Sequence, residues 1–353
     1  MRKVSINNAE EGAKLGKSIF NLQGNVLLSA GAKLNSKYIK RLRSLGISEL
    51  FIEDEISYGV EVEDFISENT RLKAKVAIYN VLQKAATTNK VDREAVHSVA
   101  RNLVEEVLAN GRIMIDLTDI KSTDGYTYEH SVNVCTLSVI IAIGLGYDIR
   151  SIEELAVGAI LHDIGKIKIP VEILNKPGKL TDSEYSTIKQ HTVLGYKIIR
   201  ESGNFGAFTK YLALTHHERV DGNGYPLGLD NSKLHDFAKI VSVADCFDAM
   251  TSDRVYRAKL HVVEAIEYLN SMSTYQFDYE TVRCFMKYVA VFPVGTGVVL
   301  NNKMKGLVVH TNNVTSRPRV RIIYNEKNEK LEEYFEIDLM KELALSVEDV
   351  CEL

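Results

Sequence analysis

The sequence predicts a mainly α-helical protein with a helical core and a small β-rich module at each end. Hydrophobic residues recur at helical spacing from about residue 64 and dominate the stretch from about 113 to 290. Short β-branched runs between Gly and Asn turns lie near both termini. A length of 353 residues favours two or three domains over one. We expect β-rich modules at 1–62 and 293–353, a helical linker at 63–112 and a helical core domain at 113–292.

The N-terminal module is expected to contain short strands and one helix. Strands are predicted at 18–20 and 26–28 around the turn Gln23-Gly24-Asn25, followed by a helix at 36–45 and a strand at 49–52. Two amphipathic helices then form the linker, the second beginning after a cap at Asp92. Their apolar faces, which could also hold a homodimer together, comprise Val76, Tyr79, Leu82 and Ala86, then Val96, Val99, Leu103 and Val107.

The core domain carries clear start and stop signals. Thr181 and Glu184 form a capping box at the start of a helix, and the turn-forming segment 221–226 must be a loop. Pro293 and Gly295 end the helical region. Strands are then expected at 297–300, 306–310, 320–324 and 334–337.

The composition is ordinary for a soluble globular protein, with 45% hydrophobic and 25% charged residues. The longest apolar run, 132–145, is too short to cross a bilayer, and Met1 begins no signal peptide, so we expect a cytoplasmic protein. Four cysteines without close spacing favour neither disulfides nor a zinc finger. A net charge of −4 argues against binding DNA or RNA polymers, so local cations would have to attract an anionic substrate.

His162 and Asp163 are the first candidate functional residues. They lie near the end of a helix expected at 152–166. His162 falls on the buried face of this helix, and Asp163 lies one position further around it. Burying these two side chains there without a partner would cost several kcal/mol, so they must be hydrogen-bonded or must coordinate a metal. The alternative is a histidine–aspartate hydrogen bond that merely fills a core.

Four further side chains favour coordination. His216 and His217 are adjacent, and they can reach one site only near a helix end or with two metals between them. His191 precedes them, and Asp245 lies within a strongly apolar helix. Nitrogen and oxygen donors without a thiolate suit iron or manganese, and their number favours two ions, a standard device for phosphodiester hydrolysis. His130 is less distinctive, because it could be an exposed histidine at a helix start.

Long motifs in this region resemble those of the HD-GYP family. The resemblance covers roughly residues 113–290. Its motifs are His162-Asp163-Ile164-Gly165-Lys166, Lys176-Pro177-Gly178 before His191, His216-His217-Glu218-x-x-Asp221-Gly222-x-Gly224-Tyr225-Pro226, and Asp245-x-x-Asp248-Ala249-Met250-Thr251-Ser252-x-Arg254-x-Tyr256-Arg257.

The resemblance implies an HD-type metallohydrolase core and a phosphodiesterase that converts cyclic di-GMP to linear pGpG and, if cleavage continues, GMP. A hydroxide bridging two iron or manganese ions would attack phosphorus in line. The implied metal ligands are His130, His162, Asp163, His191, His216, His217 and Asp245, with Asp163 bridging the ions. Lys166 would contact the phosphate, and the residues expected beside the substrate are Asp124, Tyr225, Arg254 and Arg257.

One departure and several alternatives accompany this interpretation. Some members carry a glutamate one turn before the first histidine and hold a third metal, but Tyr126 stands there and Glu129 points elsewhere, so we favour two metals. The intact Gly-Tyr-Pro loop argues against a degenerate member. Tyr225 could stack on a base or pack the loop. The alternatives are a receptor that binds cyclic di-GMP without cleaving it, a nucleotidase, and a phosphodiesterase for another cyclic dinucleotide.

Overall fold

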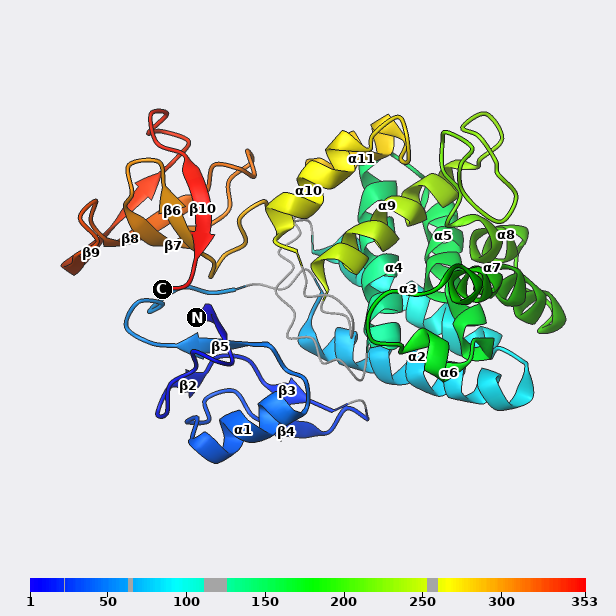
Figure 1. Ribbon diagram of the computed structural model, residues 1–353, viewed down its shortest axis with the longest axis horizontal. Coiled ribbons are helices and arrows are strands. Elements are labelled where there is room, and N and C mark those ends of the chain that lie inside the picture. The colour runs from blue at the N-terminus through cyan, green and yellow to red at the C-terminus, as the bar shows by residue number, and fades with distance from the viewer. Residues whose placement is uncertain (22, 63–65, 111–125, 253–259) are drawn as a thin grey trace. The chain divides into compact units, whose positions relative to one another are not determined.

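The computed structural model describes residues 1–21, 23–62, 66–110, 126–252 and 260–353. They form two compact units. The β unit holds the described residues of 1–62 and 287–353, and the helical unit holds those of 66–110 and 126–286. The predicted fold class is confirmed, because helices form the core and small sheets form from the two ends of the chain (Figure 1).

The N-terminal part of the β unit contains a three-stranded antiparallel sheet, a hairpin and one helix. The sheet has the order β1-β5-β2, and β3 pairs with β4. Asn35 caps the helix by accepting the backbone N–H of Tyr38 at 2.8 Å. The predicted strands and helix are confirmed, whereas β1 and β2 had not been predicted. The elements are β1 (Arg2–Ser5), β2 (Lys14–Leu15), β3 (Ile19–Phe20), β4 (Val26–Leu28), α1 (Ser36–Ser44) and β5 (Glu49–Glu53).

The C-terminal part is a five-stranded antiparallel sheet with the order β10-β6-β7-β8-β9. Four of its strands overlap the predicted ones, and the last strand, β10, had not been predicted. The strands are β6 (Gly297–Leu300), β7 (Lys305–His310), β8 (Arg319–Tyr324), β9 (Lys330–Asp338) and β10 (Val347–Cys351).

The two ends of the chain share a hydrophobic cluster within the β unit. Its N-terminal members include Phe51 and Ile56, and its C-terminal members include Leu307 and Ile323. Arg321 adds a polar link, because its Nη1 donates to the carbonyls of Ile56 at 3.2 Å and Tyr58 at 2.7 Å. The segments 1–62 and 293–353 therefore pack together.

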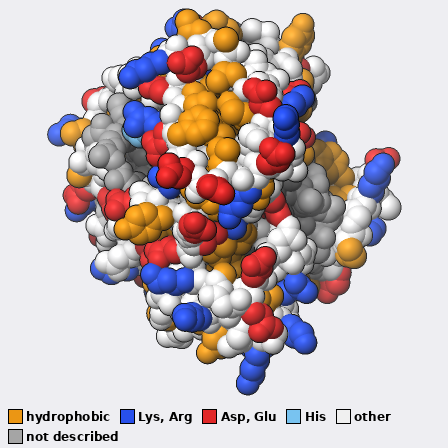
Figure 2. Space-filling model, turned by 90° about the vertical axis from the view of Figure 1, so that its left-hand side faces the viewer, with side chains coloured by type: hydrophobic (Ala, Val, Ile, Leu, Met, Phe, Trp, Pro, Cys, Tyr) orange, Lys and Arg blue, Asp and Glu red, His pale blue; other side chains and the backbone are white. Residues whose placement is uncertain are grey.

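Charged side chains of both signs are mixed on the surface. Figure 2 shows acidic and basic side chains interspersed among hydrophobic ones on the face that it draws. Ion pairs join several of them, among them Arg2 Nε with Asp54 Oδ2 at 2.7 Å and Lys303 Nζ with Glu348 Oε2 at 2.6 Å.

The helical unit is built around α4, which packs against both α5 and α9 (Figure 1). The two helices predicted as a linker, α2 and α3, pack on each other and on α4, so they belong to this unit. Its core includes fully buried Leu155, Leu212, Phe247 and Phe285. The helices are α2 (Glu68–Thr88), α3 (Arg93–Ala109), α4 (Tyr126–Gly144), α5 (Ile149–Leu161), α6 (Val171–Leu174), α7 (Asp182–Glu201), α8 (Ala207–Thr215), α9 (Asp236–Thr251), α10 (Val262–Ser271) and α11 (Tyr279–Met286).

The predicted helix at 152–166 is wrong at its C-terminal end. Helix α5 stops at Leu161, His162 caps it, and a separate 3₁₀ helix, η2 (Ile164–Lys168), follows Asp163. Gly165 permits the close packing of η2 on α7, because a Cβ at this position would lie 1.8 Å from the carbonyl oxygen of His191. This close approach brings Asp163 to His191.

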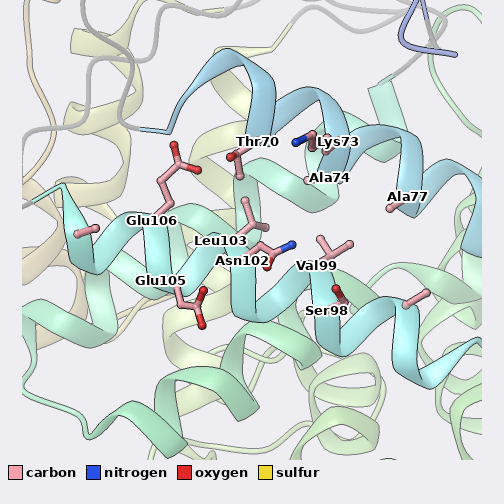
Figure 3. Close-up of a pocket in the computed structure, with 12 residues that line it drawn as sticks. Thr70, Lys73, Ala74, Ala77, Ser98, Val99, Asn102, Leu103, Glu105 and Glu106 are labelled. Carbon is pink, nitrogen blue, oxygen red and sulfur yellow. The ribbon is translucent and has the colours of Figure 1, made fainter.

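A groove of about 620 Å³ runs between α2 and α3. Figure 3 shows Thr70 and Ala74 of α2 and Val99 and Asn102 of α3 among its lining side chains. The homodimer contact predicted for this helix pair stays a prediction. No helix in the described part of the chain is long and apolar enough to cross a membrane.

Candidate metal centre

The structure brings the seven predicted ligand side chains into two adjoining groups. Each residue offers one potential ligand atom, and within each group these atoms all lie within 4.8 Å of one another. The side chains come from α4, the end of α5, α7, the end of α8, and α9. One group is Asp163, His191, His216 and His217, and the other is His130, His162 and Asp245.

Asp163 lies between the two groups and turns one carboxylate oxygen to each. Its Oδ1 is 3.3 Å from His191 Nε2 and 3.6 Å from His216 Nε2. Its Oδ2 is 3.4 Å from His162 Nε2 and 3.5 Å from His130 Nε2. A carboxylate in this position can bridge two cations.

Backbone hydrogen bonds orient three of the rings. The Nδ1 of His162 and of His191 lies 2.7 Å from a carbonyl oxygen of the preceding helical turn, and that of His216 lies 3.0 Å from one. Because a carbonyl only accepts, each Nδ1 carries a hydrogen and each Nε2 faces the centre. This is the arrangement by which proteins prepare histidine for metal binding.

The arrangement of these nitrogen and oxygen atoms suits a bound cation better than a core without one. Nε2 of His191 and Nε2 of His216 lie 3.2 Å apart. Burial lowers the pKa of His191 to about 3 and also lowers the pKa of His216, so both rings are neutral and the two acceptors repel each other. Among the described residues, buried His162 Nε2 and Asp163 Oδ1 have no hydrogen-bond partner. A metal between the groups would satisfy these atoms.

The two carboxylates of the centre are ionised. Burial by itself would raise the pKa of Asp163, but the Lys166 ammonium and the neighbouring His162 outweigh it and hold the pKa well below its usual range. Burial likewise opposes ionisation of Asp245, and His130 outweighs it and lowers that pKa. The protein therefore supplies two negative charges to balance cations.

His130 is buried, so the alternative of an exposed helix-start histidine is wrong. Its Nε2 is 3.0 Å from Asp245 Oδ1, and its Nδ1 is 2.7 Å from Asp248 Oδ2. Burial alone would lower its pKa, but the carboxylates of Asp163, Asp245 and Asp248 raise it to about 10. A metal at Nε2 would displace the proton there.

Asp248 orients the His130 ring by a hydrogen bond, and it was not among the site residues predicted from the sequence. It is fully buried, three residues after Asp245 on α9. The argument that identified Asp245, a carboxylate inside an apolar helix, applies equally to Asp248 and could have found it.

Glu218 was likewise not singled out, and it organises the Gly-Tyr-Pro loop. Its two carboxylate oxygens accept the backbone N–H of Leu227 at 2.6 Å and of Leu229 at 3.0 Å. Gly224 lies so close that a Cβ there would be 2.4 Å from the Cα of Glu218. The loop is therefore held directly beside the adjacent histidines.

Tyr225 packs this loop on the metal centre. Its ring stacks on the His217 ring with centroids 4.8 Å apart, and Lys189 Nζ lies 5.1 Å from the Tyr225 centroid. Tyr225 therefore packs the loop, and its contact with a base stays a prediction.

Other predicted residues lie partly outside the described structure. Asp124, Arg254 and Arg257 fall outside the described residues, and so does the side chain of Tyr126. Glu129 pairs with Lys75 of α2. Lys166 is described, and its Nζ pairs with Asp163 Oδ2 at the edge of the centre.

Comparison with known proteins adds the family. An HD domain matches residues 112–281, and a KOW domain associated with HD domain matches residues 297–353. Cyclic di-GMP phosphodiesterase PA4108 of Pseudomonas aeruginosa is 33% identical over 258 residues, which are 72% of this chain and 62% of that protein. The cyclic di-GMP phosphodiesterase of Thermotoga maritima is 42% identical over 168 residues, 46% of this chain and 45% of that protein. These matches support the resemblance of this chain to the HD-GYP family.

Both ligand groups lie inside the matched HD domain. The HD domain and the cluster together identify a metal-binding site. A third relative, the 3'3'-cGAMP-specific phosphodiesterase 1 of Vibrio cholerae, is 35% identical over 173 residues, 46% of this chain and 37% of that protein. The chain thus spans less than two thirds of the length of each of these relatives.

Proposed function

We propose that this chain is a metal-dependent phosphodiesterase that hydrolyses cyclic di-GMP to linear pGpG and, if cleavage continues, GMP. The observation that carries the proposal is the Asp163 carboxylate between two groups of inward-facing imidazoles. The names of the Pseudomonas and Thermotoga relatives support the substrate. The proposed catalytic domain spans residues 113–292.

The proposed centre holds two ions, with Asp163 bridging them. Iron or manganese is the proposed metal, because the donors are imidazole nitrogens and carboxylate oxygens without a thiolate. When bound, such a pair lowers the pKa of a water and neutralises charge on the phosphodiester. The chain contributes the remaining ligands, for which we propose His130, His162, His191, His216, His217 and Asp245.

Residues around the centre would bind and orient the substrate. We propose that Lys166 contacts the phosphate that is cleaved, since its ammonium already lies beside Asp163. Arg254 and Arg257 are proposed to hold the rest of the dinucleotide, because the planar guanidinium suits both phosphate and the guanine edge. Asp124 and Tyr225 complete the proposed surroundings.

The test of this function is product analysis with the metal-loaded protein. Incubation with cyclic di-GMP should yield pGpG, identified by chromatography and mass, and a chelator should abolish the reaction. The same assay with 3'3'-cGAMP tests a second candidate substrate, which the name of the third relative supports. Binding of cyclic di-GMP without any product in the metal-loaded protein would favour the receptor alternative.

Lys166→Ala should retain bound metal and lose turnover. Removing a group that stabilises charge on the transferring phosphoryl typically lowers kcat by about 10²–10³-fold. The measurement is kcat for cyclic di-GMP together with the metal content of the purified variant. Lys168→Ala is the matched control, because Lys168 lies on the same 3₁₀ helix and is exposed. Equal kinetics in the two variants would remove Lys166 from the mechanism.

A further inference from the structure

A row of buried polar side chains runs from helix α2 to the metal centre. Arg71 Nη1 donates to Asn133 Oδ1 at 3.3 Å, and Asn133 Nδ2 donates to Asp248 Oδ1 at 2.9 Å. Asp248 Oδ2 is in turn 2.7 Å from His130 Nδ1. All four side chains are buried. The row therefore connects a helix predicted as a linker with one of the proposed ligands.

The chemistry of the row fixes its direction. Arginine only donates hydrogen bonds and an ionised carboxylate only accepts them. The Asn133 amide, which could otherwise flip, must therefore turn its oxygen to Arg71 and its nitrogen to Asp248. Asp248 then accepts from His130 Nδ1, which leaves His130 Nε2 facing Asp245 at 3.0 Å.

Helix α2 presents different faces to its two neighbours. Thr70, Ala74 and Ala77 line the groove with α3 (Figure 3). Arg71 and Lys75 contact α4 instead, at Asn133 and Glu129.

These two contacts are one helical turn apart on both helices. The hydrogen bonds described above connect the Arg71 contact, and not the Lys75 contact, to a proposed ligand. Arg71 also lies outside the matched HD domain, which begins at residue 112.

We propose that Arg71 is a positioning residue of the metal centre. Through Asn133 and Asp248 it holds the His130 ring, and so it sets the affinity for the ion bound by the group of His130, His162 and Asp245. The inference rests on the proposed metal-dependent function. The affinity for the second ion should not depend on Arg71, because backbone carbonyls orient the rings of His191 and His216.

The test is calorimetric titration of Mn²⁺ into the metal-stripped full-length protein. The parent should bind two equivalents. Loss of a residue that hydrogen-bonds a metal ligand typically lowers metal affinity about 10–100-fold. Arg71 lies further from the ligand, so Arg71→Met should weaken the binding of one Mn²⁺ equivalent by about 3–10-fold. The other equivalent should change by less than about 2-fold. Arg71→Lys, which keeps the charge but loses the planar fork, should show a smaller loss.

Lys75→Met is the matched control, because it removes the neighbouring contact of the same helix. It should leave both Mn²⁺ affinities unchanged. Equal losses in Lys75→Met and Arg71→Met would attribute the effect to general helix docking and overturn the inference.

A double-mutant cycle tests whether Arg71 acts through Asp248. Arg71→Met should cause no further loss in an Asp248→Asn background, since both changes interrupt the same row. Should Arg71→Met not fold, Arg71→Lys in both backgrounds serves the same purpose, and additive losses would overturn the inference.

The parent protein separates failure of this inference from failure of the proposed function. A parent that binds no Mn²⁺ would overturn the proposed metal centre itself. A parent that binds two equivalents, with Arg71→Met equal to it, would overturn only the role of Arg71.

Discussion

Asp163→Ala is expected to abolish turnover of cyclic di-GMP and to lower the bound metal below the parent's content. Asp163 is the side chain that turns one oxygen to each ligand group, so its loss removes a donor from both. Metal pairs contribute several kcal/mol of transition-state stabilisation, which predicts a fall in kcat of at least about 10³-fold. The measurements are kcat and metal content by plasma emission after anaerobic purification.

Asp148→Ala is the control for a general loss of stability. Asp148 caps the start of α5, the helix that ends just before His162, by accepting the backbone N–H of Ser151 at 3.0 Å. Losing this cap removes one hydrogen bond at the start of α5 but removes no proposed ligand. Metal content should therefore stay at the parent's level. Full metal content and full activity in Asp163→Ala would contradict the bridging role.

Several side chains of the metal centre, such as His162, Asp163 and Asp245, could be selected from the sequence because each of them conflicts with its surroundings. A histidine or aspartate on an apolar helix needs a partner, and the structure gathers these residues from five places in the chain. Their bonding to a metal stays a prediction. The strongest local signals, such as the capping box at Thr181 and Glu184, were confirmed to the residue.

What the sequence could not supply is contact between distant segments. His130 was ambiguous because its burial depends on Asp248, 118 residues further along the chain. Arg71 carried no signal at all, since nothing local distinguishes a buried arginine from one on a solvated helix face. The hydrophobic cluster that joins Phe51 to Leu307 is equally invisible to helical or strand periodicity.

Strand β2 was missed for a related reason. β2 has only two residues and gains its definition from pairing with β5, so its own alternation is too brief to detect. The end of α5 was misplaced because the apolar spacing continues through Lys166. The contact of η2 with α7, which local spacing cannot predict, takes up the residues that follow.

Gly165→Ala should damage the metal centre without touching any ligand side chain. The new Cβ would lie 1.8 Å from the His191 carbonyl oxygen and 2.6 Å from the backbone N of Gly195, and backbone atoms cannot rotate away as side chains do. Overpacking typically costs about 1–3 kcal/mol, and this position should reach about 3 kcal/mol or more. That predicts a fall in melting temperature of about 6–12 °C in the helical unit.

The movement of η2 that Gly165→Ala forces should also separate Asp163 from His191, so metal content should fall with stability. Gly206→Ala is the comparison, because no atom lies within 4 Å of its Cβ and its φ is −57°. It should cost no more than about 1 kcal/mol, the usual scale of a change at a helix cap, and should keep the metal. If Gly165→Ala melted and bound metal like Gly206→Ala, the close packing of η2 on α7 would not be what brings Asp163 to the centre.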